Sequence, residues 1–172
     1  AWGSARFNNE RLLVERLLQQ GQLQAAYQRA QALLEQAKRV GPTAYAGADY
    51  DLGIAHFLLG RVLKKGGQAA HALPLLVEAQ RLFEALGDSG ARMATISLTD
   101  LADCLVALGQ LDEAVTRYKD AIQRSEKLND VRQVAVGKGQ LAEVLRLQGR
   151  TADALAAHAE ARDLFAAQNE PA

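Results

Sequence analysis

The side chains best suited to catalysis or metal binding are few, and they do not cluster in this sequence. The three histidines, His56, His71 and His158, lie far apart along the chain, and none has a histidine or cysteine one helical turn away. Metal sites and acid–base pairs on helices need such neighbours, because residues three or four apart share one helix face. We therefore expect no metal, no cofactor and no catalytic centre.

Two further candidates for chemistry have simpler explanations. The tripeptide Gly137-Lys138-Gly139 resembles part of a phosphate-binding loop, but the remaining glycine and the hydroxyl residue after the lysine are missing. No serine or threonine lies in a nucleophile-elbow motif. The single Cys104 cannot form an internal disulfide, which is typical of a buried thiol in a reducing compartment. The sequence thus predicts a non-enzymatic, cytoplasmic protein.

The composition predicts an all-helical chain and gives no sign of a nucleic-acid or membrane partner. Of the 172 residues, 49% are hydrophobic but only 5% are aromatic, and the apolar residues are mostly Ala and Leu. Lys plus Arg and Asp plus Glu are equal in number, at 20 each, so no net field attracts nucleic acid or an anionic membrane. No apolar stretch approaches the ~20 residues needed to span a bilayer, and no signal-peptide pattern is present. We expect no nucleic-acid or membrane partner.

One sequence pattern recurs around four glycines, Gly21, Gly67, Gly109 and Gly149. Leucines precede each glycine by eight and by four residues: Leu13 and Leu17, Leu59 and Leu63, Leu101 and Leu105, Leu141 and Leu145. An alanine follows each by five residues: Ala26, Ala72, Ala114 and Ala154. A residue that tolerates left-handed backbone follows each by twenty: Gly41, Gly87, Asn129 and Asn169. Such self-similarity at about 40 residues is typical of a solenoid.

The spacings predict a helix, a tight turn at the glycine and a second, antiparallel helix in each unit. We expect eight helices, at about 5–20, 22–40, 45–65, 68–86, 91–108, 110–128, 131–148 and 150–168, with a longer loop at 41–47. The repeats then cover 5–41, 45–87, 91–129 and 131–169 of one domain spanning 1–172. Pro74 conflicts with the fourth helix, so that helix either begins late or kinks near Ala70.

These units resemble tetratricopeptide repeats. The signature is a small residue after the first-helix leucine (Leu59-Gly60, Leu101-Ala102, Leu141-Ala142), followed by the turn glycine and the alanine. The endings Leu86-Gly87-Asp88 and Leu128-Asn129-Asp130 are similar to the longer repeats of kinesin light chains and of bacterial signalling proteins. The family's proline after the second helix is missing, and the first unit is the poorest match. The resemblance implies an all-α, right-handed superhelical solenoid of four antiparallel helix pairs, and a protein-binding role.

In this family the first helix of each unit lines the concave groove, so the exposed stripe of those helices is the candidate binding surface. Positions ten, six and three before each glycine share that stripe, and we expect ten groove residues there: Arg11, Glu15, Phe57, Arg61, Lys64, Thr99, Asp103, Val106, Glu143 and Arg146. Phe57 with Arg61 and Lys64 forms an aromatic and basic patch. Alternatively, Phe57 packs inward and Arg61 pairs with Glu15 and Asp103. None of the positions six before a glycine is asparagine, unlike the chaperone-tail receptors of the family.

We expect a protein–protein interaction scaffold that binds a peptide or a partner helix in this groove, as part of a larger signalling or regulatory protein. The alternative is a self-assembly module. Solenoids need polar end caps, whereas the last helix carries Leu155, Leu164 and Phe165, and Trp2 and Phe7 are expected to be exposed at the other end. Self-association would then proceed through the terminal helices.

Overall fold

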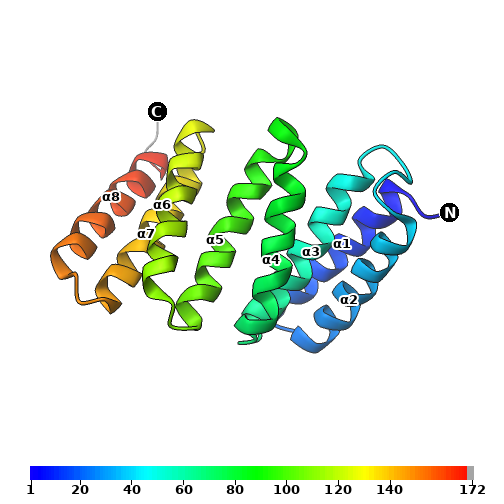
Figure 1. Ribbon diagram of the computed structural model, residues 1–172, viewed down its shortest axis with the longest axis horizontal. Helices are drawn as coiled ribbons and strands as arrows, with labels where there is room; N and C mark the ends of the chain where they lie inside the picture. The colour runs from blue at the N-terminus through cyan, green and yellow to red at the C-terminus, as the bar shows by residue number, and fades with distance from the viewer. Residues whose placement is uncertain (170–172) are drawn as a thin grey trace. The chain divides into compact units, whose positions relative to one another are not determined.

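The computed structural model describes residues 1–169, which form eight α-helices and one short 3-10 helix with no strand among them. In chain order these are α1 (Ser4–Gln19), α2 (Leu23–Val40), α3 (Ala48–Lys65), α4 (Ala69–Glu84), η1 (Gly87–Gly90), α5 (Ala91–Ala107), α6 (Leu111–Lys127), α7 (Val131–Leu147) and α8 (Thr151–Asn169) (Figure 1). Every α-helix begins and ends within three residues of its predicted bounds. The all-α helical repeat is therefore confirmed.

The chain divides into two compact units, Ala1–Ser97 and the part from Leu98 onward, and α5 crosses the boundary. In the first unit α1 packs against α2, α2 against α3, and α3 against α4. In the second unit α7 packs against both α6 and α8. The single domain over 1–172 and the right-handed sense of the solenoid stay predictions.

The four repeat glycines make one and the same turn. Their φ angles lie between 72° and 80°, in the left-handed region that favours glycine. The residue after each glycine donates its backbone N–H, at 2.9 Å, to a leucine carbonyl. That leucine lies four residues before the glycine, and the four acceptors are Leu17, Leu63, Leu105 and Leu145. This bond satisfies a helix-end carbonyl and reverses the chain, so that the next helix starts within two residues.

Small residues allow the two helices of each pair to approach closely. The alanines five residues after the turn glycines are all buried, and so are Ala102 and Ala142. At Gly60, a Cβ atom would lie only 2.8 Å from the Leu76 Cγ of α4, so no larger residue fits without movement. The repeated small residues are thus packing positions.

The leucine pattern is buried unevenly. Five of the eight leucines are buried, and three are only half-buried: Leu13, Leu17 and Leu63. In α1 the fully packed positions are shifted by one residue, to Val14 and Leu18. The expectation that all eight leucines are buried is therefore wrong at Leu63 of the second repeat and at both leucines of the first repeat, which is also the poorest match to the pattern.

The expectations for the loop at 41–47, for Pro74 and for the left-handed residues have different outcomes in the structure. The segment 41–47 is the expected long connection between α2 and α3. Pro74 lies inside α4, which begins at Ala69 rather than late, so the helix continues through the proline. Gly87 and Asn129 have the expected positive φ angles, of 65° and 54°. The 3-10 helix η1 after α4 was not expected.

Candidate functional site

Four of the expected groove residues line one cleft in the first unit, between α1 and α3. Glu15, Phe57, Arg61 and Lys64 surround a volume of about 410 Å³. The remaining lining residues are Leu18, Gln19, Leu58 and Lys65. We call this the α1–α3 cleft. Both helices are the first helices of their repeats, and the stripe spacing places these side chains on the shared face.

The rim of the α1–α3 cleft is mainly cationic. Arg61, Lys64 and Lys65 contribute three positive charges from the last two turns of α3. The single lining carboxylate, Glu15, accepts a hydrogen bond of 2.8 Å from Arg11 Nη1 one turn before it on α1. Arg11 therefore offsets the charge of Glu15, and the other charged side chains that line the cleft are all cations.

Phe57 is buried, with only 5% of its surface exposed, and the expected partial exposure of this ring is wrong. The Arg61 side chain lies one turn further along α3, and its guanidinium carbon is 4.6 Å from the ring centroid. The aromatic ring therefore forms the floor beneath Arg61. A ligand in this cleft meets the guanidinium before it meets the ring.

In the second half of the chain, the expected groove residues make local contacts instead. Thr99 is buried, against expectation. All of residues 97–102 of α5 are buried, so this part of the helix has no solvent-exposed face. Val106 is half-buried. Asp103 is also half-buried and accepts a hydrogen bond from the Tyr118 hydroxyl of α6. The Asp103 carboxylate is thus engaged by the core of its own repeat.

Glu143 and Arg146 are exposed on α7 and bind one another. Arg146 donates through Nη2 at 2.5 Å to Glu143 Oε1 and through Nε at 3.1 Å to Glu143 Oε2. The hydrogen bond from Arg146 lowers the pKa of Glu143. Such a solvent-exposed pair contributes little to stability, so a partner could separate the two charges at small cost.

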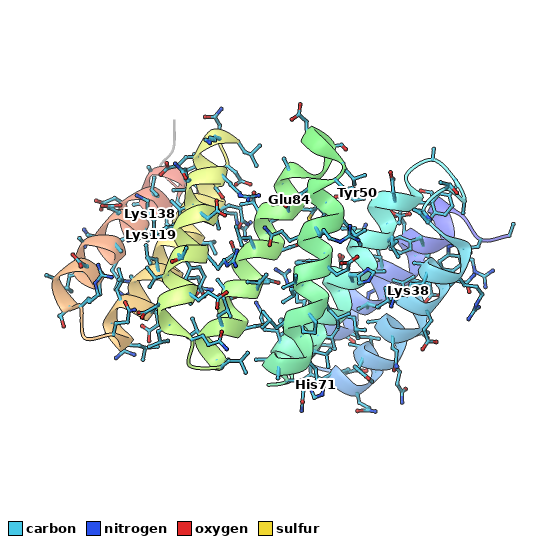
Figure 2. All side chains as sticks on the ribbon, viewed as in Figure 1. Lys38, Tyr50, His71, Glu84, Lys119 and Lys138 are labelled. Carbon is cyan, nitrogen blue, oxygen red and sulfur yellow. The ribbon has the colours of Figure 1, made fainter. Side chains whose placement is uncertain are left out.

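Of the three histidines and the cysteine, His56 and Cys104 are core residues and the other two lie on the surface. His56 is buried, its Nδ1 lies 2.9 Å from the Leu52 carbonyl oxygen, and burial lowers its pKa, so the ring is neutral. His71 and His158 are exposed (Figure 2 labels the first). Cys104 is buried and free. Within residues 1–169 no group of three potential metal ligands comes together.

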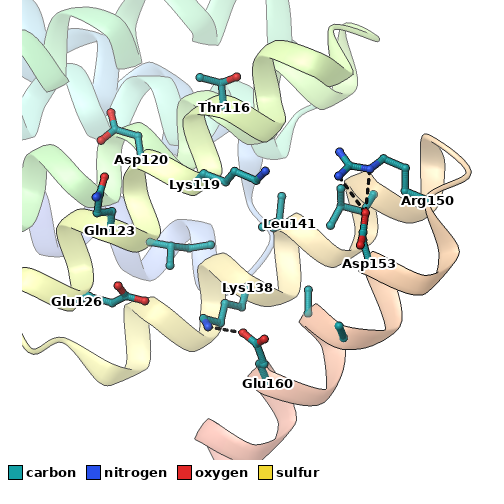
Figure 3. Close-up of a pocket in the computed structure, with 14 residues that line it drawn as sticks. Thr116, Lys119, Asp120, Gln123, Glu126, Lys138, Leu141, Arg150, Asp153 and Glu160 are labelled. Atoms are coloured by element: carbon teal, nitrogen blue, oxygen red, sulfur yellow. Dashed lines mark hydrogen bonds and ion pairs between the residues drawn. The ribbon is translucent and has the colours of Figure 1, made fainter.

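A larger cleft, of about 820 Å³, lies between α6, α7 and α8 of the second unit and was missed by the sequence analysis (Figure 3). We call it the α6–α8 cleft. Its apolar floor consists of Ile122, Leu141, Leu145, Ala156 and Ala157. Its polar rim consists of Thr116, Lys119, Asp120, Gln123, Glu126, Lys138, Arg150, Asp153 and Glu160. The signal in the sequence was the pair of alanines seven and eight residues after Gly149, where the third repeat has Thr116 and Arg117.

Residues 92–167 match the family model of the tetratricopeptide repeat. This segment is a tetratricopeptide repeat region. The fourfold glycine, leucine and alanine pattern and the four equivalent turns extend the same repeat to the helices before residue 92. A comparison with curated protein sequences gives no significant match.

Solved structures of the same fold share little sequence with this chain. Aspartyl phosphate phosphatase F from Bacillus subtilis superposes with a TM-score of 0.83 at 15% identity, over 96% of this chain and 42% of that one. A Rap protein complexed with Competence and Sporulation Factor gives 0.79 at 18% identity, over 95% and 44%. YrrB, a tetratricopeptide repeat protein with an unusual peptide-binding site, gives 0.53 at 21%, over 90% and 84%. This chain therefore spans less than half of the first two proteins, and the likeness shows the fold alone.

The described helices include none that is long and apolar enough to cross a membrane.

Proposed function

We propose that this protein is an interaction scaffold that holds an acidic peptide or partner helix in the α1–α3 cleft. The observation that carries the proposal is the cleft itself, in which Arg61, Lys64 and Lys65 rim a buried aromatic ring. Solenoids act by offering such surfaces. A Rap protein complexed with a factor and YrrB with its peptide-binding site share the fold, which supports a peptide as the ligand. A cytoplasmic location and a place in a larger signalling or regulatory protein belong to the same proposal.

The expected contribution of Asp103, Val106, Glu143 and Arg146 to peptide binding stays a prediction. Asp103 is held by Tyr118, and Glu143 is held by Arg146, so these groups must exchange partners before they bind a ligand. The α1–α3 cleft needs no such exchange at Lys65, which is exposed at the end of α3. We therefore place the main anchor of the peptide in the first unit.

The test is a selection of displayed random peptides on the immobilised full chain, followed by affinity measurement of the enriched peptides. We expect acidic peptides, and we expect Arg61→Glu with Lys64→Glu to weaken them by about tenfold or more, because two attractions become repulsions. Lys38→Glu with Arg39→Glu is the matched control, since it reverses two exposed cations near the end of another helix, α2. Equal affinity after the reversal at Arg61 and Lys64 removes the cleft from the binding site.

Self-assembly is the second candidate function, and one observation favours it. On α8 Leu155 is 65% exposed and Phe165 is 40% exposed, while Leu164 is half-buried. Leaving a large apolar side chain in water forgoes ~1.5–3 kcal/mol of burial, and exposed apolar residues promote association. Sedimentation velocity over a range of concentrations tests this function. Association that persists after Leu155→Asp with Phe165→Asp excludes α8 as the contact.

A further inference from the structure

At the α6–α8 cleft the last repeat has small residues where the other repeats have larger ones. Ala156 and Ala157 line it from α8, seven and eight residues after the repeat glycine. The corresponding positions are Thr116 and Arg117 in the third repeat, Pro74 and Leu75 in the second, and Gln28 and Arg29 in the first. Beneath these methyl groups, the largely buried Ile122, Leu141 and Leu145 form the floor between the helices.

Most of the charges on the rim of this cleft are already paired. Lys138 of α7 binds Glu160 of α8, and both line the cleft. Arg150 binds Asp153, with Nη2 3.0 Å from Oδ2. Asp120 is 3.0 Å from Arg124 Nε. Because these charges are paired, the remaining charged groups on the rim determine which charges on a ligand the cleft binds.

The side chains of two exposed rim residues of α6, Lys119 and Glu126, make no ion pair or hydrogen bond within the part of the chain that the structure describes. Figure 3 shows the Lys119 side chain extending over the cleft, and Figure 2 shows Lys119 and Lys138 on the same part of the surface. Lys119 and Glu126 are seven residues apart, which is two turns and about 10 Å on one helix face. The cleft therefore offers a cation at one end, a carboxylate at the other and an apolar floor between.

We propose that the α6–α8 cleft is a second docking surface, and that its partner is an amphipathic helix with an acidic and a basic residue seven positions apart. The spacing of the two charges favours a helical partner. Residues seven positions apart on a partner helix are separated by the same two turns as Lys119 and Glu126. In an extended peptide the same-side positions recur every ~6.8 Å and do not match this separation. Small and medium apolar residues between the two charges pack on Ala156 and Ala157, above the largely buried Leu141 and Leu145, in the manner of a helix laid in a groove.

This surface is separate from the face that carries the expected peptide groove. On α7, Lys138, Leu141 and Leu145 line the cleft, whereas the groove prediction uses Glu143 and Arg146. Leu141 and Glu143 are two residues apart and thus about 200° apart around the helix. The two functions can therefore be removed independently.

The test uses three labelled helical peptides, stabilised by a side-chain lactam and titrated against the full chain by fluorescence anisotropy. They share an Ala/Leu face and differ only at two positions seven residues apart, which carry Glu and Lys, Glu and Glu, or Lys and Lys. We expect the wild-type chain to bind the Glu/Lys peptide about two- to fivefold more tightly than the others. Lys119→Glu makes the Lys/Lys peptide the tightest, and Glu126→Lys makes the Glu/Glu peptide the tightest.

Two controls separate this site from the rest of the protein. Ala157→Phe fills the cleft and abolishes binding of all three peptides, whereas Ala166→Phe, on the far side of α8 and exposed, leaves binding unchanged. Arg61→Glu with Lys64→Glu also leaves it unchanged, so failure of the α1–α3 proposal does not affect this one. No measurable binding of any peptide at millimolar concentration, or an order of affinities that ignores the substitutions at Lys119 and Glu126, overturns the proposal.

Discussion

Two glycines of α7, Gly137 and Gly139, allow a direct test of how tightly the last repeats are packed. A Cβ atom added at Gly137 would lie 2.7 Å from Ile122 Cγ1 of α6, whereas one added at Gly139 would meet no atom within 4 Å. The two residues lie in the same helix and two positions apart. The substitutions Gly137→Ala and Gly139→Ala therefore differ in their packing and in little else.

The expected magnitudes follow from two opposing effects. In a helix interior, alanine is favoured over glycine by about 1 kcal/mol, and this gain is common to both positions. At Gly137 the new methyl group also overpacks the core, which costs ~1–3 kcal/mol. Ile122 cannot easily swing away, because a β-branched side chain in a helix has one strongly preferred χ1 angle. We expect Gly139→Ala to stabilise the protein by about 1 kcal/mol, and Gly137→Ala to be neutral or destabilising by up to ~2 kcal/mol.

Urea unfolding followed by circular dichroism measures both variants, and thermal melts should separate them by roughly 2–4 °C for each kcal/mol. A double-mutant cycle identifies the cause. Ile122→Ala removes the crowding atom, so Gly137→Ala in that background should stabilise as Gly139→Ala does. If Gly137→Ala raises the wild-type midpoint as much as Gly139→Ala, then α6 and α7 do not meet at Ile122 and the packing argument is refuted.

Three further predictions concern the packing, the polar core and the turns. Ala114→Leu should cost ~1–3 kcal/mol, because Ala114 is fully buried where α6 meets its partner helix, and an unchanged thermal midpoint would show that this crossing is not tight. Tyr118→Phe should cost ~1–3 kcal/mol, since it removes the hydroxyl that donates to Asp103. Burial and the Asp103 carboxylate raise the Tyr118 pKa. The neutral phenol therefore stabilises the fold below the unfolded pKa of about 10, and stability falls as the pH rises above it. Urea midpoints from about pH 8 to about pH 11 should fall less steeply in Tyr118→Phe than in wild type. Gly109→Ala should cost about 1–2 kcal/mol although the space around it is open, because its φ of 79° strains an L-residue; a melt equal to wild type would contradict this.

The helices and turns could be predicted from the sequence because their determinants are local and repeated. A turn at Gly67 depends on its own φ angle and on a carbonyl four residues earlier, and both are encoded within one short segment. The same holds for the left-handed Asn129. Four copies of the pattern then fix the register, which a single copy could not.

The burial of particular side chains could not be predicted in the same way, because it depends on neighbours that the repeat does not encode. Phe57 occupies a stripe position that predicts exposure, yet the Arg61 guanidinium covers its ring. Thr99 occupies the same stripe and is buried with the rest of its turn of α5. In α1 the buried positions are Val14 and Leu18, and no offset from Gly21 indicates that shift.

The α6–α8 cleft shows which part of a repeat sequence carries information about binding. Leucine, glycine and alanine at the shared offsets are the same in every unit, because each unit must make the same turn and the same crossing. Positions that differ between units are free of that constraint, and Ala156 and Ala157 differ from their counterparts by becoming smaller. A loss of side-chain volume at a variable position costs packing energy unless something else fills the space. The two alanines of α8 line the α6–α8 cleft, and Ala157→Phe tests whether the space beside them is a docking surface.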